Sequence, residues 1–290
     1  MLCAGGAVVD LKIRFTAPAV AGTSNPGTGS ASLGGVARNV AENLAALGVP
    51  VSLLSAVGDD APGQALILAA QRCGIATDHV AVLPGEVTAQ YVALLEPDGG
   101  LSVGAAAMAV LDRITTGHLQ AAWPGQGWVF CDGNLSPPVL ALALDQGRRE
   151  ARPVAFDAVS THKVLRLPRD LSGLSLLSCN RAEARAWLGR HGLPTDGDDK
   201  TLATALRAAG AGAVLLTRGP AGLVVASEGV LAEVPAVPAS PIDVTGAGDA
   251  LMAGTLAALI GGADLVTAAR AGAERAARTV ESELSVLPAS

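Results

Sequence analysis

Residues Pro241–Asp264 read PIDVTGAGDALMAGTLAALIGGAD and form the most informative stretch of this chain. Small residues from Thr245 to Gly248 lead directly into one carboxylate, Asp249, and a run of Ala, Leu, Met and Gly follows. The pattern predicts a loop that turns into a helix with apolar residues on every side, which is typical of a helix buried inside a protein. A single ionisable group at the start of such a helix needs an explanation from the rest of the sequence.

The loop itself suggests an anion site. Gly246, Ala247 and Gly248 have almost no side chains, so a ligand can approach their backbone N–H groups closely. The first N–H groups of a helix lack partners within the helix and carry its partial positive charge, so a phosphate fits there. Asp249 would then lie beside the anion, where a base that accepts a hydroxyl proton belongs, and the helix start is expected to keep it ionised. The alternative is an acidic residue that only caps a tightly packed helix.

Composition limits the class of protein. The chain has 290 residues, of which 50% are hydrophobic and 16% charged, and its net charge is −6. This length suits one large α/β domain or two small ones with a full hydrophobic core. No run of Lys or Arg is present, so a general nucleic-acid-binding protein is disfavoured.

The cysteines and the apolar segments bear on location. The four cysteines are scattered and form no CxxC pair, which favours small buried residues in a reducing compartment over disulfides or zinc: Cys3, Cys73, Cys131 and Cys179. The start MLCAGGAVVD lacks a basic leader, and the longest apolar run, Ala250–Ala263, is too short to span a bilayer. We therefore expect a cytoplasmic protein that makes no membrane contact.

Short apolar runs alternate with helical segments along the chain. The helical period is clearest in residues 36–48, with apolar Val36, Val40, Leu44 and Leu47, and a second helix is expected at 201–210. Strands are expected in the runs AGGAVV, VSLLSAVG, GWVFCD, PVAFD, LSLLSCN and AVLLTRG. This alternation predicts an α/β fold with a mainly parallel sheet, helices on both faces, and ligands at the carboxyl ends of the strands.

Two segments break the alternation. Residues 11–33 and 86–104 read as strands and turns, and EPDGG within the second segment is a strong hairpin signal. They are either edge strands of the main sheet or a small β-flap that covers a site, and the flap is favoured. No repeat or linker divides the chain, so a single domain over residues 1–290 is expected.

Three further motifs suggest ligand contacts. Gly34 and Gly35 precede a helix whose first turns carry Asn39, although an ordinary core helix with a solvated Asn39 would look alike. Asn180 and Glu183 share one helix face just after a strand, which suits a metal-bound water or a phosphate, or a helix cap. The third motif, LLTRGPAG, contains the strand-ending and turn residues Thr217, Gly219 and Gly222.

In this order and spacing, the motifs resemble the PfkB (ribokinase-like) carbohydrate kinases over Gly5 to about Pro288. The signatures are GGVARNVAENLAALG near the N-terminus and DVTGAGDALMAG near the C-terminus. The resemblance implies a ribokinase-like three-layer fold with a small β-lid made of the two irregular segments. It also implies transfer of a phosphoryl group from ATP with Mg²⁺, and it allows a homodimer paired through the lid.

The resemblance also implies roles for individual residues. Asp249 matches the catalytic base, and Gly246, Ala247 and Gly248 match the anion hole. Asn180 and Glu183 match the motif that organises Mg²⁺ and phosphate, with Glu183 acting indirectly, and Thr217, Gly219 and Gly222 match the ATP loop. The sugar hydroxyls would be held by Asp10, Gly34, Gly35 and Asn39. Asp243 and Thr245 match a site where many members bind a potassium-like cation.

Within the family the chain is most similar to pseudouridine kinases, in SNPG (Ser24–Gly27), GGVARNVAENLAALG, LLSAVGDDAPGQ and CDGNLS (Cys131–Ser136). The implied reaction is phosphorylation of the ribose 5′-hydroxyl of pseudouridine. A ribokinase or another nucleoside or sugar kinase is the alternative within the family. A catalytically silent sugar- or nucleoside-binding protein is the alternative outside it.

Overall fold

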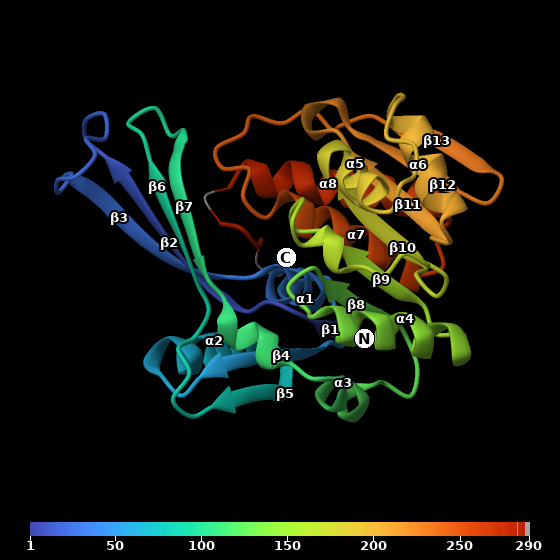
Figure 1. Cartoon of the computed structure of the whole chain (residues 1–290), viewed down its shortest axis with the longest axis horizontal. Helices are drawn as coiled ribbons and strands as arrows, with labels where there is room; N and C mark the ends of the chain where they lie inside the picture. Colours follow the sequence, from blue (N-terminus) through green and yellow to red (C-terminus); the bar gives the residue numbers. More distant parts are fainter. Residues whose placement is uncertain (283, 288–290) are drawn as a thin grey trace.

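The computed structural model describes residues 1–282 and 284–287, which form two β-sheets (Figure 1). The larger sheet has nine strands in the order β13-β12-β11-β10-β9-β8-β1-β4-β5. Its strands are β1 (Leu2–Ala4), β4 (Ser52–Gly58), β5 (Ala76–Leu83), β8 (Val129–Asp132), β9 (Val154–Asp157), β10 (Leu176–Asn180), β11 (Ala213–Thr217), β12 (Leu223–Ser227) and β13 (Val230–Val234). Neighbours pair in parallel, except that β12 runs antiparallel to both β11 and β13.

Helices cover both faces of this sheet, as the alternation of apolar runs predicts (Figure 1). The helices are α1 (Val36–Ala46), α2 (Ala61–Arg72), α3 (Thr116–Ala122), α4 (Pro137–Arg149), α5 (Arg181–Arg190), α6 (Asp199–Ala208), α7 (Ala247–Ile260) and α8 (Leu265–Val280), with 3₁₀ turns η1 (Ala109–Arg113), η2 (Val164–Arg166) and η3 (Gly219–Ala221). One hydrophobic core contains α3 to α6, and the other contains α1, α7 and α8. Side chains alternate between them along β1, where Leu2 and Ala4 face the first core and Cys3 the second. The three-layer fold predicted from the sequence is confirmed.

Most strand predictions agree with the structure, and one is wrong. AGGAVV does not form a single strand, because β1 ends at Ala4 and the next strand begins at Val8. A Cβ on Gly5 would lie 2.3 Å from the carboxylate of Asp132, so the chain bends away here with φ 147°. The prediction of buried thiols holds for Cys3, Cys131 and Cys179, whereas Cys73 is exposed.

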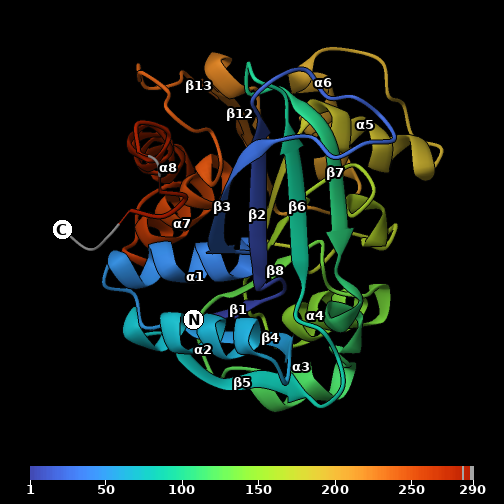
Figure 2. The same cartoon turned by 90° about the vertical axis from the view of Figure 1, so that its left-hand side faces the viewer.

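A second, four-stranded sheet lies beside the main body (Figure 2). This small sheet has the order β3-β2-β6-β7, with bounds β2 (Val8–Phe15), β3 (Gly27–Gly34), β6 (Gln90–Leu95) and β7 (Leu101–Ala107). Residues 11–33 and 86–104 supply most of it. The predicted hairpin at EPDGG is confirmed, because Glu96 and Gly100 close the turn between β6 and β7 and Gly99 has φ 90°.

Helix α7 is buried over its first half, which explains its apolar composition. Every residue from Asp249 to Leu256 is buried, and α7 packs against both α1 and α8. A Cβ on Gly254 would lie 2.9 Å from the Cα of Gly272, so the backbones of α7 and α8 come into direct contact. None of the helices in the described residues is long and apolar enough to cross a membrane.

Candidate active site

The start of α7 leaves its backbone donors open. Gly246 is the residue before the helix and adopts the left-handed conformation, φ 83° and ψ −3°, without any side-chain cap. A Cβ there would lie 2.2 Å from the carbonyl oxygen of Ser285, so the position requires glycine. Within residues 1–282 and 284–287, the N–H groups of Gly248 and Asp249 make no hydrogen bond. These donors are available to an anion.

Asp249 lies in the first turn of α7 and is 9% exposed. Its Oδ2 accepts a hydrogen bond of 2.8 Å from the Nδ2 of Asn39, which belongs to α1 and is only 5% exposed. The interpretation of Asn39 as a solvated residue is therefore wrong. The structure brings together two predicted site residues that are 210 positions apart.

Burial opposes the expected contribution of the helix start to the ionisation of Asp249. Burial raises the pKa of Asp249 well above its usual value, the hydrogen bond from Asn39 opposes this rise, and the carboxylates of Asp157, Asp132 and Asp10 add to it. Burial can shift a pKa by ~3–5 units. A helix start contributes only ~0.3–1 kcal/mol, less than one unit. The protein therefore favours the protonated form of Asp249 more than an exposed aspartate would.

Acidic groups follow the carboxyl ends of neighbouring strands. Asp132 ends β8 and Asp157 ends β9. Burial raises the pKa of Asp157 to about 7, and the negative charge of Glu183 contributes to the rise although the N–H of Val159 opposes it. Val159 has φ 63°, an unusual conformation for a β-branched residue, and donates its N–H to the Oδ1 of Asp157 at 2.9 Å. Strain of this kind is common at functional sites.

The glycine pair before α1 is required by close packing. A Cβ on Gly34 would lie 2.0 Å from the Oδ2 of Asp10, and one on Gly35 would lie 2.4 Å from the carbonyl oxygen of Gly6. Gly35 has φ 97°. The pair therefore brings Asp10, from the small sheet, against the start of α1.

Asp132 is a residue that the sequence reasoning missed. Its buried Oδ2 accepts 2.9 Å hydrogen bonds from the N–H groups of Gly6 and Ala37, and its Oδ1 accepts one of 2.8 Å from Asn134. Asp132 therefore caps α1 from another strand and fixes the turn at Gly6. The available signal was its position at the end of a buried strand, which is where ligand-site residues gather in α/β sheets.

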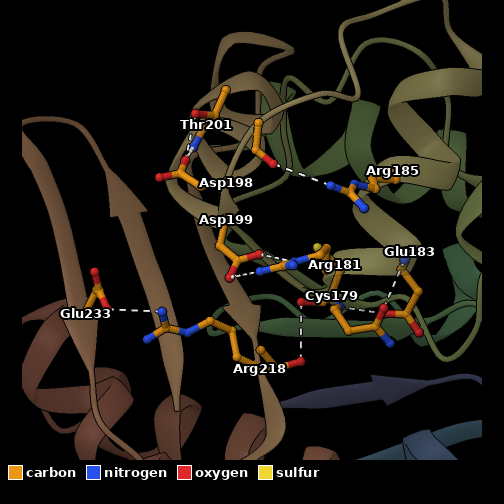
Figure 3. Close-up of polar contacts among 12 residues, drawn as sticks. Cys179, Arg181, Glu183, Arg185, Asp198, Asp199, Thr201, Arg218 and Glu233 are labelled. Carbon is orange, nitrogen blue, oxygen red and sulfur yellow. Dashed lines mark hydrogen bonds and ion pairs between the residues drawn. The ribbon is translucent and has the colours of Figure 1, made fainter. Parts of the chain in front are cut away.

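Asn180 and Glu183 form a reciprocal cap at the start of α5 (Figure 3). The Oε2 of Glu183 accepts the N–H of Asn180 at 2.8 Å, and the Oδ1 of Asn180 accepts the N–H of Glu183 at 3.0 Å. Burial raises the pKa of Glu183 although these hydrogen bonds oppose the rise. The helix-cap alternative is thus present in the structure, and it leaves a buried carboxylate close to Asp157.

The predicted ATP loop lies at the end of β11. Thr217 ends the strand, and its hydroxyl donates to the carbonyl oxygen of Cys179 at 3.5 Å. Gly219 has φ 56°, and a Cβ there would meet no atom within 4 Å, so the surface beside it has room for a ligand. Gly222 is required for a different reason, because a Cβ there would lie 2.1 Å from the carbonyl oxygen of Val234.

A hollow of about 550 Å³ lies beside the small sheet. It is lined by the end of β7, by residues 108–112 and by the polar side chains of Asn134, Lys163 and Arg166. The Nζ of Lys163 donates hydrogen bonds to the Oδ1 of Asn134 and, at 3.4 Å, to the Sδ of Met108. The hollow adjoins the Gly5–Gly6 turn, since a Cβ on Gly6 would lie 2.7 Å from the Nδ2 of Asn134. Asn134, Lys163 and Arg166 are not among the predicted site residues, and Glu86 and Asp112 also line the hollow.

The acidic groups do not form a direct metal cage. Within the described ranges, no group of three or more His, Cys, Asp or Glu side chains could hold a metal ion. Mg²⁺ usually keeps several waters and takes one or two carboxylates together with substrate phosphates. Asp157 and Glu183 fit that mode, because burial destabilises the charged form of each carboxylate and acidic neighbours add to this effect at Asp157.

A family model described as pfkB family carbohydrate kinase matches residues 3–289. This chain belongs to that family. The pfkB family assignment makes it a phosphotransferase with an alcohol group as acceptor. A pseudouridine kinase from Escherichia coli is 34% identical over 245 residues, which cover 82% of this chain and 77% of that protein.

Solved structures of similar proteins agree with the pfkB assignment. A carbohydrate kinase from Agrobacterium tumefaciens has a TM-score of 0.82 and 30% identity, covering 98% of this chain and 92% of that one. A ribokinase from Thermotoga maritima has a TM-score of 0.85 at 16% identity, covering 99% and 95%. The second likeness shows the fold alone.

Proposed function

We propose that this pfkB-family chain is an ATP- and Mg²⁺-dependent kinase that phosphorylates the ribose 5′-hydroxyl of pseudouridine. The observation that carries the reaction is the position of Asp249 at the open start of α7, with its Oδ2 held by Asn39. The similarity to a pseudouridine kinase supports the substrate. The alternative within the family is a ribokinase or another nucleoside or sugar kinase.

Asp249 is the proposed catalytic base, and its Oδ1 is the proposed acceptor. Asn39 occupies Oδ2, which leaves Oδ1 to accept the hydrogen bond of the substrate hydroxyl. A carboxylate is far too weak a base to deprotonate an alcohol beforehand, so the proton moves late, as the new P–O bond forms. The raised pKa of Asp249 favours this uptake.

Gly246, Ala247, Gly248 and the N–H of Asp249 form the proposed anion hole. The open N–H groups of Gly248 and Asp249 would hold the oxygens of the phosphoryl group, whereas the N–H of Ala247 donates to the carbonyl oxygen of Val244 at 3.3 Å in this structure. A single well-placed donor contributes ~10²–10³ in rate. The chain therefore acts mainly by alignment and by stabilising charge.

The chain offers separate surfaces for the nucleotide and for its metal. ATP with Mg²⁺ supplies the phosphoryl group and neutralises its charge when bound. We assign Thr217, Gly219 and Gly222 to the nucleotide, with Gly219 providing the open surface. Asn180 and Glu183 would hold waters of the metal, with Glu183 acting indirectly.

The sugar would lie between the small sheet and the start of α1. Asp10, Gly34, Gly35 and Asn39 are the proposed contacts for its hydroxyls. The small sheet then acts as the lid of a single domain, and its closure excludes water from the phosphoryl group and suppresses hydrolysis of ATP.

The hollow beside β7 is the proposed nucleobase pocket. Lys163 and Arg166 can donate to the two carbonyl oxygens of a uracil-type base, and the Oδ1 of Asn134 can accept a ring N–H. Pseudouridine presents one ring N–H more than uridine. A site built on such a hydrogen bond discriminates by up to ~10⁴–10⁵, whereas shape alone gives roughly 10–200-fold.

The test is kcat/KM with ATP and Mg²⁺ for pseudouridine, uridine, ribose and adenosine. We expect pseudouridine first. Lys163→Met should lower kcat/KM for pseudouridine and leave the rate with ribose nearly unchanged, and Arg149→Met, on the exposed end of α4, is the matched control. If ribose or adenosine ranked first, the proposal of pseudouridine as the substrate would be wrong, whereas the proposal of kinase activity would still hold. Binding of a nucleoside without any turnover would favour the silent binding protein.

The small sheet also bears on assembly. Its outer strand β7 is exposed along its whole length and β3 along most of it, and unpaired edges of this kind readily meet another chain. We propose a cytoplasmic homodimer paired through the lid. Sedimentation equilibrium of the purified protein would show a monomer if this arrangement is wrong.

A further inference from the structure

Lys12 connects the small sheet to the loop before α7. Its Nζ lies 2.8 Å from the Oδ2 of Asp243 and 3.0 Å from the Oγ1 of Thr245, residues more than two hundred positions away. Asp243 and Thr245 directly precede Gly246, the residue that opens the anion hole. The contact therefore links a lid strand, β2, to the backbone that would bind the phosphoryl group.

The resemblance to the family implies a potassium-like cation at Asp243 and Thr245, but the residues of this chain do not fit one. Both side-chain oxygens that would face the ion already accept hydrogen bonds from an ammonium group. The remaining carboxylate oxygen, Oδ1 of Asp243, accepts the N–H of Thr245 at 2.8 Å. A second cation on the same oxygens would be repelled by the ammonium group.

We propose that Lys12 is a tethered cation that takes the place of a free monovalent cation beside the anion hole. The inference rests on the proposed kinase reaction but not on its substrate. Lys12 acts as a positioning residue, since it holds the Asp243–Thr245 loop and touches no reacting atom. The lysine also makes the shape of this loop depend on the position of β2.

The electrostatics of Asp243 agree with this role. Burial by itself would raise the pKa of Asp243, but the hydrogen bonds from Lys12 and Thr245 outweigh it and lower the pKa to about 2. The carboxylate is thus a fixed negative charge with a fixed partner. The pair is part-exposed, with side-chain exposures of 30% for Lys12 and 33% for Asp243, so solvent screens part of the attraction.

The geometry of β2 explains why this lysine reaches the loop. Asp10 and Lys12 are two positions apart on one strand, so their side chains leave the same face of the small sheet. Asp10 lies against Gly34 at the start of α1, and Lys12 lies against the loop before α7. One strand therefore contacts the approaches to both helix starts of the site.

The test compares the wild type, Lys12→Met and the control Arg14→Met in potassium, sodium or choline chloride at equal ionic strength. Arg14 lies on the same strand but near the turn at Gly99, away from α7. We expect kcat of the wild type and of Arg14→Met to be the same in all three salts. Lys12→Met should lose at least ~10-fold in choline chloride, within the usual range of coupling between sites, and recover when potassium is added.

Thermal melting supplies a readout that does not depend on activity. Removal of the ammonium group frees two oxygens, so potassium should raise the melting temperature of Lys12→Met and leave that of the wild type unchanged. If Lys12→Met does not fold, Lys12→Gln is melted instead. Activation of the wild type by potassium, or no effect of potassium on the melting of the Lys12 variants, would overturn the proposal. If no acceptor is phosphorylated, the proposed function is wrong, and the effect of potassium on the melting temperature alone tests the role of Lys12.

Discussion

Helices α5 and α7 both carry an acidic residue in the first turn, but the two side chains make different contacts. Each carries a carboxylate at its third position, Glu183 in α5 and Asp249 in α7. The residue before the first turn of α5 is Asn180, and the side chains of Asn180 and Glu183 each accept the backbone N–H of the other residue. The residue before the first turn of α7 is Gly246, which has no side chain. The carboxylate of Asp249 accepts its hydrogen bond from Asn39 on another helix instead.

The difference shows that the residue before a helix decides what an acid in its first turn can do. With an asparagine cap, the acid satisfies a backbone N–H of its own helix, and the helix start is closed. With a glycine in the left-handed conformation, the donors stay open and the acid is free to serve a site. Substitutions at the two helix starts test this difference.

Asp249→Asn should have the largest effect. We expect kcat to fall by at least ~10², the usual loss for a missing general base. ATP binding should persist, and the melting temperature should not fall, because the amide replaces a carboxylate that burial already disfavours. The exposed N-cap change Asp264→Asn in α8 is the control. Near-normal turnover of Asp249→Asn would remove this residue from the mechanism.

Asn39→Ala should lower kcat by roughly 10-fold through misplacement of the base. It should also move the acidic limb of the kcat–pH profile to higher pH, because the lost hydrogen bond is the one that lowers the pKa of Asp249. Asn43→Ala is the matched control, since Asn43 lies one turn further along α1 and bonds to Arg275 and to the backbone carbonyl of Asn39, not to Asp249. An unchanged pH profile in Asn39→Ala would show that the contact is only structural.

Glu183→Gln should have a smaller effect, since glutamine can still accept the N–H of Asn180 while the charge is lost. We expect a weaker dependence on Mg²⁺ concentration and a kcat that falls more than the KM of the sugar changes. Glu183→Ala should also lose ~1 kcal/mol of unfolding free energy with the cap. If Glu183→Gln changes only thermal stability, capping is the whole role of Glu183.

The smallest expected effect is a pH dependence of stability. The folded pKa of Asp157 is about 7 against 3.8 for an exposed aspartate, so the folded protein binds more protons between these values. The contribution of Asp157 to stability is therefore fully present below pH 3.8 and is lost as the pH rises through about 7. The melting temperature should fall by a few degrees from pH 6 to pH 8. Asp157→Asn should flatten this trend, and an equally steep trend in that variant would assign it to other groups.

The sequence predicted what depends on local pattern. The glycine turn before α7, the apolar helix, the hairpin at Gly99 and the strands that end at Asp132 and Asp157 all follow from neighbouring residues. The bond between Asn39 and Asp249 could not be predicted, because helical periodicity does not tell which distant helix a side chain meets. The raised pKa of Asp249 could not be predicted for a related reason, since burial depends on the whole fold.

Long-range contacts also explain the other failures. Asp132 holds Gly6 and Ala37, and Lys12 holds Asp243, across chain segments that are far apart in the sequence and adjacent only in the folded protein. The continuous apolar pattern of AGGAVV predicts one strand. Its division into two strands depends on Asp132, far along the chain, which lies against Gly5.

The direct backbone contact between α7 and α8 at Gly254 and Gly272 has a consequence for the hydrogen exchange of the amides. Amides of residues Ala250–Leu256 are buried where α7 packs against α1 and α8, so their exchange should require loss of this packing, as in global unfolding. Amides of β3 and β7 lie on an exposed sheet and should exchange through local opening of much lower free energy. The open donors of the anion hole thus begin a helix whose buried turns should open rarely, while β3 and β7 of the small sheet should open more often.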